Sequence, residues 1–237
     1  MGLLKKLWNN KWILFYFPFT LFFNFKYLPF RQAVKIPILL YKPKIRGKGK
    51  YIIQGETRTG MIRMGQPLVS VYRQGGVVLE NNGTVIFKGN ALFGGGSAIS
   101  VGASGVLEIG NHFSNQYHGI IICYYKIKLG ECVRLGWDCL ICDTDFHKMK
   151  SIDNRNYSKG YGEIIISDYV WVASFCKFYK NTFIPPYCTV AANTLLNKHI
   201  DCEPYSIISS TTGIKTKYVG MYRDINDDTI DYISEEK

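Results

Sequence analysis

The stretch 164–198, IIISDYVWVASFCKFYKNTFIPPYCTVAANTLLNK, decides the fold. Apolar side chains recur in it at every sixth position: Ile166, Val172, Phe178, Ile184, Val190 and Leu196. A second set lies four residues after each of the first five: Val170, Cys176, Thr182, Cys188 and Thr194. Because side chains of an extended strand alternate between its two faces, both sets point to the same side. Neither a helix nor a flat sheet has this period.

A six-residue apolar period is typical of a parallel β-helix, in which short strands stack into a prism. The earlier residues Leu129, Leu135 and Ile141 follow the same spacing. Less regular steps of Val or Ile followed by Gly occur at 101–102 and 109–110. The sequence therefore predicts an all-β chain, with the β-helix over residues 51–220.

The chain has seven cysteines, an odd number, and is too long to be a disulfide-stapled miniprotein. We therefore expect reduced thiols in a cytosolic setting. Cys139, Cys176 and Cys188 lie at inward repeat positions, which favours a stacked column in the core over chemistry. Cys139 and Cys142 have the C-x₂-C spacing of zinc ligands but no second pair follows, so no metal site is predicted.

The repeat is interrupted after Ile141. Extending the register places Asp143, Asp145 and His147 where the pattern requires apolar residues. Because unpaired buried charges are costly, the chain must turn outward here or form a paired polar site. A polar stretch follows over 148–163 and is expected to form a loop that leaves the prism. A histidine beside carboxylates suits a general base, and a solvated surface turn is the alternative; spacing alone does not decide between them.

The positive charge of the chain is confined to its first fifth. Residues 1–50 contain eleven Lys and Arg and no acidic residue, and the first carboxylate is Glu56. The remaining 18 basic and 18 acidic residues balance. Because phosphate binding requires a basic surface, the body is not expected to bind nucleic acid. With 47% apolar residues, the chain is also not expected to be disordered.

Residues 1–50 are also rich in aromatic side chains. The run 12–25, WILFYFPFTLFFNF, is shorter than the ~20 residues needed to span a bilayer. Aromatic rings flanked by Lys and Arg suit the membrane interface, so we expect peripheral membrane contact through residues 1–50. The alternative is packing on the body or on a partner subunit. Residues 221–237 are expected to be a short C-terminal tail.

Two segments together resemble a known family, and a third supports them. LGECVRLGWDCLICDTDFHKM (129–149) resembles a family segment that ends in D-x-D-x-H. The stretch 164–198 is similar to the repeats around V-W-I-G, and 109–122 adds a weaker match. The family is that of the left-handed β-helix (hexapeptide-repeat) acyltransferases, of the bacterial sugar and polysaccharide O-acetyltransferase type. The resemblance covers about residues 80–220 and implies a left-handed coil.

The resemblance also implies acetyl-CoA as acyl donor and a homotrimer with active sites between neighbouring prisms. His147 falls on the catalytic histidine of the family, and Asp145 or Asp143 would orient it. Gln116 aligns with an acceptor-binding amide. Trp137 is a candidate sugar platform, or alternatively a packed aromatic at the rim. The cofactor channel would be lined by Trp171, Ala173, Ser174, Ala192, Asn197, Lys198 and Lys217.

The resemblance thus implies an O-acetyltransferase that acts on a sugar hydroxyl of a bacterial envelope glycan, such as capsule or O-antigen. It would work in the cytoplasm, peripherally on the inner membrane. One alternative is an N-acyltransferase on an amino-sugar nucleotide. Another is a non-catalytic β-helix scaffold of a glycan assembly complex.

Overall fold

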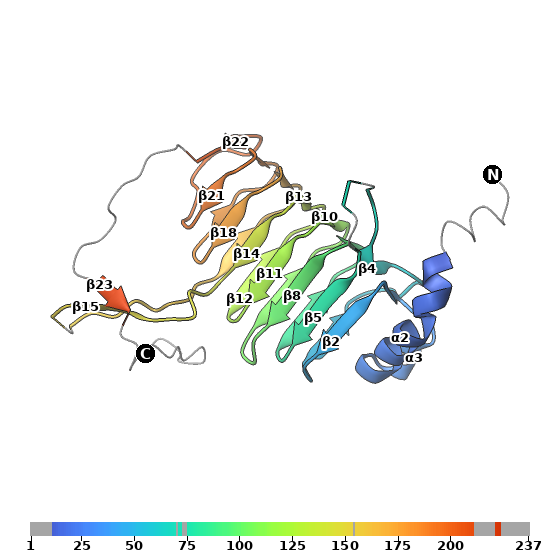
Figure 1. Ribbon diagram of the computed structural model, residues 1–237. Helices are drawn as coiled ribbons and strands as arrows, with labels where there is room; N and C mark the ends of the chain where they lie inside the picture. The colour runs from blue at the N-terminus through green and yellow to red at the C-terminus, as the bar shows by residue number, and fades with distance from the viewer. Residues whose placement is uncertain (1–10, 70, 73–74, 154, 211–220, 224–237) are drawn as a thin grey trace.

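The computed structural model describes residues 11–69, 71–72, 75–153, 155–210 and 221–223. Its body is a coil of three parallel sheets, which we name A, B and C (Figure 1). Sheet A contains β1 (Ile38–Leu40), β4 (Ile62–Gln66), β7 (Ala91–Gly94), β10 (Phe113–Tyr117), β13 (Arg134–Trp137), β17 (Trp171–Val172), β20 (Thr189–Val190) and β22 (Ile207–Ile208). Sheet B contains β2 (Pro43–Arg46), β5 (Val77–Asn81), β8 (Ser97–Val101), β11 (Ile120–Cys123), β14 (Leu140–Cys142), β18 (Lys177–Tyr179) and β21 (Leu195–Leu196). Sheet C contains β3 (Lys50–Ile53), β6 (Thr84–Phe87), β9 (Val106–Ile109), β12 (Lys126–Leu129), β16 (Ile164–Ile166) and β19 (Phe183–Ile184).

The core of the coil consists of the residues that the six-residue period marks as inward. All six side chains from Ile166 to Leu196 in that series are at least 95% buried. Equivalent residues of successive coils stack in register in sheet C, as Val85, Leu107, Ile127 and Ile164 do. This arrangement confirms the predicted all-β parallel β-helix. Its left-handed sense stays a prediction.

Sharp corners separate the three sheets. Non-glycine residues with positive φ occupy these corners at six-residue intervals: Tyr169, Phe175, Asn181, Tyr187 and Asn193. Most residues avoid this backbone region because of steric repulsion at Cβ. At the corner between sheets C and A, the rings of Tyr169 and Tyr187 stack in parallel with their centroids 5.0 Å apart, and this contact between coils offsets part of that cost. The corners point side chains outward at fixed heights along the coil.

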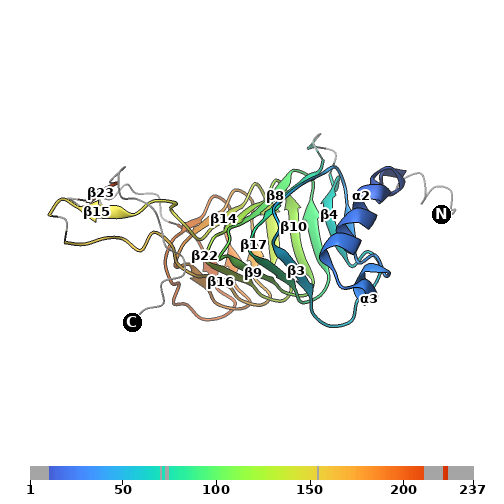
Figure 2. The same cartoon turned by 90° about the horizontal axis from the view of Figure 1, so that it is seen from below.

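A helical cap closes the N-terminal end of the coil (Figures 1 and 2). It consists of α2 (Lys11–Tyr27) and α3 (Phe30–Ala33), and α2 packs on β1. The side chain of Asn24 is fully buried and hydrogen-bonds both the N–H and the C=O of Ile38. The hydroxyl of Thr20 accepts a bond from the N–H of Leu40. These polar residues thus satisfy the edge of β1, which would otherwise expose unpaired backbone groups.

The coil begins earlier in the chain than residue 51. Strands β1, β2 and β3 form its first coil, so residues 38–50 belong to the β-helix and not to an appended segment. No helix among the described residues is both long and apolar enough to cross a membrane.

An arm leaves the coil between β14 and β16, and Figure 2 shows it projecting from the end opposite the helices. Antiparallel bridges join Thr144 to Tyr161 and Lys150 to Tyr157, so the two halves of the arm run side by side. Within it, β15 (Met149–Ser151) pairs with β23 (Met221–Arg223). The predicted loop 148–163 lies in this arm, at the corner between sheets B and C.

Candidate active site

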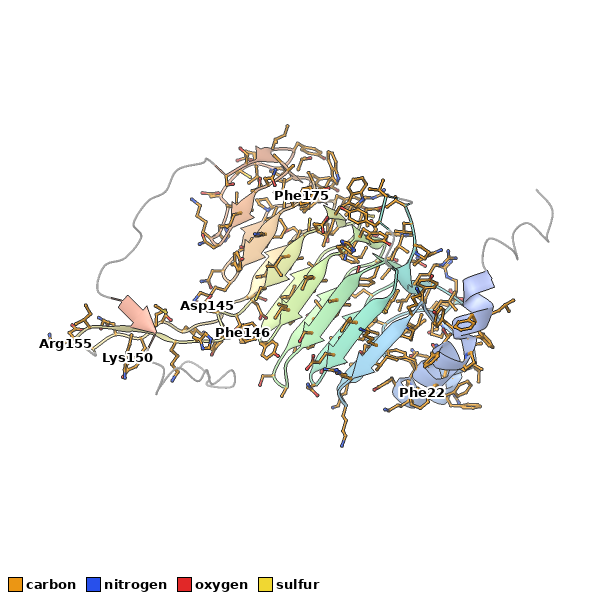
Figure 3. All side chains as sticks on the ribbon, viewed as in Figure 1. Phe22, Asp145, Phe146, Lys150, Arg155 and Phe175 are labelled. Carbon is orange, nitrogen blue, oxygen red and sulfur yellow. The ribbon has the colours of Figure 1, made fainter. Side chains whose placement is uncertain are left out.

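His147 lies at the base of the arm, at the corner between sheets B and C. The chain leaves β14 after Cys142 and turns outward through Phe146, whose φ of 62° is in the left-handed region. His147 is half-buried, and its Nδ1 atom is shielded from solvent. In Figure 3 the neighbouring Asp145 and Phe146 lie where the arm meets the coil. The imidazole therefore stands where the arm interrupts the coil between β14 and β16.

Asp143 is a buried carboxylate that supports the chain leading to His147. It is fully buried and accepts hydrogen bonds of 2.8 Å from the N–H groups of Tyr124 and Tyr125. Burial raises the pKa of its carboxyl above the ordinary value, and the two amide bonds oppose that rise. The carboxylate thus joins the arm to the preceding coil.

Asp145 lies at the surface of the same segment. Its carboxylate pairs with the ammonium of Lys180, and its N–H donates to the C=O of Gly160 at 2.7 Å. Lys180 follows β18 in the next coil, so the pair ties the base of the arm to the body. Both carboxylates of the D-x-D-x-H segment therefore have identified partners in this structure, and these partners hold the backbone around His147.

The predicted cofactor residues fall into three places. Trp171 stands on the outer face of sheet A and is 56% exposed. Ala173, Ser174 and Ala192 lie at the corner between sheets A and B, in two successive coils. Asn197 and Lys198 are exposed and follow β21, at the corner between sheets B and C that also carries His147. Lys217 lies outside the described residues.

A hollow of about 320 Å³ adjoins the corner between sheets A and B. Its lining residues are Asp138, Phe175, Lys177, Asn193, Thr194 and Leu195. The hydroxyl of Ser174 accepts a bond of 3.1 Å from the N–H of Trp137 and thereby links two coils at this corner. Ala173, Ser174 and Ala192 are close in sequence to this lining and are not part of it.

Both predicted acceptor residues belong to sheet A. Gln116 of β10 is half-buried and faces outward into a second hollow of about 550 Å³. Trp137 ends β13 and is half-buried, with its ring 5.7 Å from that of Tyr72 in an edge-on arrangement. The structure places Trp137 in an aromatic cluster at the rim.

One chain does not bring these residues together with His147. In a three-sided coil, the corner between sheets B and C is the corner that sheet A does not touch. His147 therefore faces away from Gln116 and Trp171 of the same chain. In Figure 3, Phe175 at the corner of sheets A and B is likewise far from Asp145 and Phe146. A site that combines them requires a second copy of the chain.

The structure adds a histidine–carboxylate pair that the sequence did not single out. Nδ1 of His118 lies 3.2 Å from Oδ1 of Asp138, and the hydroxyl of Tyr72 donates to Oδ2 of Asp138 at 2.6 Å. The ring of Tyr72 stacks on Tyr117 with centroids 4.5 Å apart. In the sequence these are two polar residues 20 positions apart, and only the pairing of β10 with β13 places them at one corner.

Five of the seven cysteines are buried, and Cys132 and Cys202 are half-buried. Cys139, Cys176 and Cys188 are at least 99% buried, as predicted, and all seven thiols are free. Their Sγ atoms contact carbonyl oxygens of adjacent coils, as Cys139 does with Ala173 at 3.3 Å. Among the described residues, no group of three or more His, Cys, Asp or Glu side chains is arranged to hold a metal ion.

No family model matches the chain, and no curated protein matches it in sequence. Two solved structures are similar to it. The polysialic acid O-acetyltransferase OatWY is 19% identical, with a TM-score of 0.31, over 70% of this chain and 85% of that one. The polySia-specific acetyltransferase NeuO is 12% identical, with a TM-score of 0.36, over 83% of this chain and 91% of that one.

Proposed function

We propose that the protein is an acetyl-CoA-dependent O-acetyltransferase that modifies a sugar hydroxyl of a bacterial envelope glycan. The position of His147 carries this proposal. The imidazole is half-buried at the base of the arm, on a backbone held by Asp143 and Asp145. A general base has to be held in this way, close to the substrate and partly shielded from water.

His147 would act directly on the acceptor. Its imidazole takes the proton of the hydroxyl as the hydroxyl oxygen attacks the carbonyl carbon of the acetyl thioester. The C–S bond breaks, and the imidazolium returns the proton to the departing thiolate. The products are a sugar acetate ester and free CoA thiol. General-base catalysis of this kind contributes about 10²–10⁴-fold to the rate.

The residues at the corner between sheets A and B fit the acyl donor. Ala173, Ser174 and Ala192 present small side chains beside the hollow that contains Lys177. The N–H of Ala173 donates to the C=O of Val190, so the carbonyl oxygen of Ala173 and the backbone groups of Ala192 would bond the amides of the pantetheine arm. Lys198 lies at the other corner, between sheets B and C, and would face a phosphate as a point charge if the donor lies between neighbouring copies. We assign the same role to Lys217. The donor supplies an activated thioester, so the chain needs no covalent nucleophile.

The proposed site lies between subunits. Because His147 faces away from Trp171 of its own chain, a homotrimer would place the arm of one copy beside sheet A of the next. Mixing two inactive variants, His147→Ala and Trp171→Ala, tests this arrangement. Mixed trimers contain interfaces with both residues intact, so activity should reappear after subunit exchange. Equal inactivity of the mixture and of the separate variants would contradict a shared site.

The catalytic test follows release of free CoA thiol from acetyl-CoA with a panel of capsule and O-antigen oligosaccharides. His147→Ala should lower kcat by at least 10²-fold. His118→Ala is the comparison variant, because His118 also has a carboxylate partner. That partner, Asp138, lines the hollow at the corner between sheets A and B, so the affinity of this variant for acetyl-CoA is measured as well. Loss of activity in His118→Ala alone would transfer the role of base to His118. Turnover on amino-sugar nucleotides only would indicate N-acylation, and failure to bind acetyl-CoA would favour a scaffold.

We also propose that the helical cap contacts the inner membrane surface. Its outer face exposes large apolar side chains: Leu14, Phe15, Phe19, Phe22, Phe25, Phe30 and Val34. Lys26 lies over the rings of Phe22 and Tyr27, at 5.2 and 4.9 Å from their centroids. A cation beside exposed rings suits the headgroup region of an anionic leaflet.

Vesicle co-sedimentation tests the membrane contact. Phe15→Ser and Phe22→Ser change exposed side chains and leave Thr20 and Asn24 on the coil, so the fold should persist. We expect both variants to bind vesicles containing phosphatidylserine at least fivefold more weakly than the unchanged chain. Tyr205→Ser is the control, because Tyr205 is also exposed but lies at the other end of the coil. Equal sedimentation of all variants would overturn the membrane contact.

A further inference from the structure

The outer face of sheet A carries a cationic hollow of about 550 Å³ that the catalytic proposal does not use. It extends over β4, β7, β10 and β13. Its polar lining includes Arg63, Arg134, His112, Gln116 and Ser114. Among the residues that the structure describes, no carboxylate lines the hollow. Among the described residues, none forms an ion pair with either arginine.

The strand register aligns the two arginines along one row. Arg63 is paired with Leu92, Leu92 with Ser114, and Ser114 with Arg134. All four are outward positions on successive strands, and both arginines are exposed. Three strand spacings of ~4.8 Å separate the arginines by about 14 Å. Charges at this separation suit an extended ligand that crosses several strands better than a single small anion.

Two contacts near the hollow hold its strands and one of its arginines in place. Gly94 lies beside Gln116, and a Cβ atom at Gly94 would lie 1.6 Å from the carbonyl oxygen of Gln116. The backbones of β7 and β10 therefore approach closely at Gly94. The Nε of Arg63 donates to the C=O of Gly60 at 3.2 Å, which fixes the stem of this side chain.

The hollow ends next to the proposed cofactor residues. Arg134 is the register partner of Trp171 on the adjacent strand, and both side chains point outward. The donor residues lie on later coils, from Trp171 onward, whereas the hollow lies on earlier ones. A ligand in the hollow would thus lie beside the donor residues, on the earlier coils. Gln116 and Ser114 offer hydrogen bonds to hydroxyl groups, and the guanidinium groups offer paired donors to carboxylates.

We propose that this hollow binds the glycan acceptor and that the acceptor is an acidic oligosaccharide, recognised by Arg63 and Arg134 through its carboxylate groups. The role of the bound glycan as acetyl acceptor rests on the proposed function. The binding of an acidic oligosaccharide to the hollow does not. A phosphate group of acetyl-CoA is the other oxyanion that Arg134 could face.

The test measures binding by calorimetry without acetyl-CoA, and so without any turnover. The probes are oligosialic acid and oligogalacturonic acid, each compared with its carboxyl-reduced derivative. At least one acidic probe should bind at least tenfold more tightly than its reduced form. Arg63→Ala and Arg134→Ala should each weaken that binding at least tenfold, and higher salt should weaken it further. Arg46→Ala, an exposed arginine of sheet B, is the matched control and should not change it.

The outcomes separate this proposal from the catalytic one. Acidic and reduced probes that bind equally, or a wild type that binds neither acid, would overturn the acidic acceptor. A different outcome is that Arg134→Ala weakens acetyl-CoA binding and leaves oligosaccharide binding unchanged. That result would assign Arg134 to the cofactor and would also overturn the acidic acceptor. His147→Ala should keep oligosaccharide binding. Binding without turnover in the wild type would refute the catalytic proposal and leave the hollow as a glycan site.

Discussion

Asp138 joins two residues from different coils, since its Oδ1 lies 3.2 Å from Nδ1 of His118 and its Oδ2 accepts the hydroxyl of Tyr72 at 2.6 Å. Tyr72 comes from the connection between β4 and β5, three coils before the corner that carries Asp138. The hydroxyl of Tyr117 adds a bond to the C=O of Tyr72 at 3.0 Å. This cluster fastens a long connection across the corner beside the proposed donor hollow.

Replacing Tyr72 with Phe should lower the melting temperature of the chain at and below pH 10 but not near pH 12. The bond to Asp138 raises the pKa of Tyr72 from 10.0 to about 12. A raised folded-state pKa means that the stabilisation is complete below pH 10 and is lost as the pH rises through about 12. The wild type should therefore melt at a higher temperature than Tyr72→Phe up to pH 10, and the difference should vanish near pH 12. Tyr205→Phe is the control, because Tyr205 is exposed. A difference in melting temperature between the wild type and Tyr72→Phe that stays the same up to pH 12 would contradict the bond.

Replacing Asn24 with Leu should destabilise the helical cap. The change removes the partners of the N–H and the C=O of Ile38, which are then buried without hydrogen bonds. Leaving such groups unsatisfied costs about 1–3 kcal/mol each. Urea unfolding measures the loss, and Thr20→Ser, which keeps a hydroxyl for Leu40, is the control. A Leu variant as stable as the wild type would show that α2 does not cap β1.

The two aspartates before His147 should differ in their effect on folding. Asp143→Ala removes the acceptor of two amide bonds in the core, and we expect a loss of about 1–3 kcal/mol per amide in the free energy of unfolding. Asp145→Ala removes only a partly exposed ion pair with Lys180, for which less than about 1 kcal/mol is expected. Denaturant titration of both variants measures the contrast. Equal losses would show that Asp143 is not the support of this segment.

Gly94→Ala should be among the most disruptive small changes in sheet A. Its Cβ would meet the carbonyl oxygen of Gln116, a backbone atom that cannot move without separating β7 from β10. We expect a loss of about 3 kcal/mol or more. Gly55→Ala meets nothing within 4 Å and costs only the strain of its φ of +79°, about 1–2 kcal/mol. Thermal unfolding compares the two, and a tolerant Gly94 would contradict the close strand approach.

The sequence predicted the inward side of the coil well and its outward side poorly. Positions such as Val172 and Phe178 repeat because each coil buries the same small cross-section, so a local period reveals them. The outward neighbours depend on how many residues each coil contains. Paired residues lie 18 apart for Phe178 and Leu196 but 37 apart for Leu129 and Ile166, where the arm is inserted. Pairs such as His118 and Asp138 could therefore not be read from spacing.

The sequence by itself determined the parallel β-helix, the buried cysteines and the break in the repeat at His147, because each follows from which residues an extended strand turns inward. Only the tertiary structure decided that residues 38–50 form the first coil, that Asn24 caps β1, and that Arg134 stands beside Trp171. It also set His147 on the corner that sheet A does not touch. These relationships are contacts between coils, and they depend on the register that stacking imposes over the whole length of the chain.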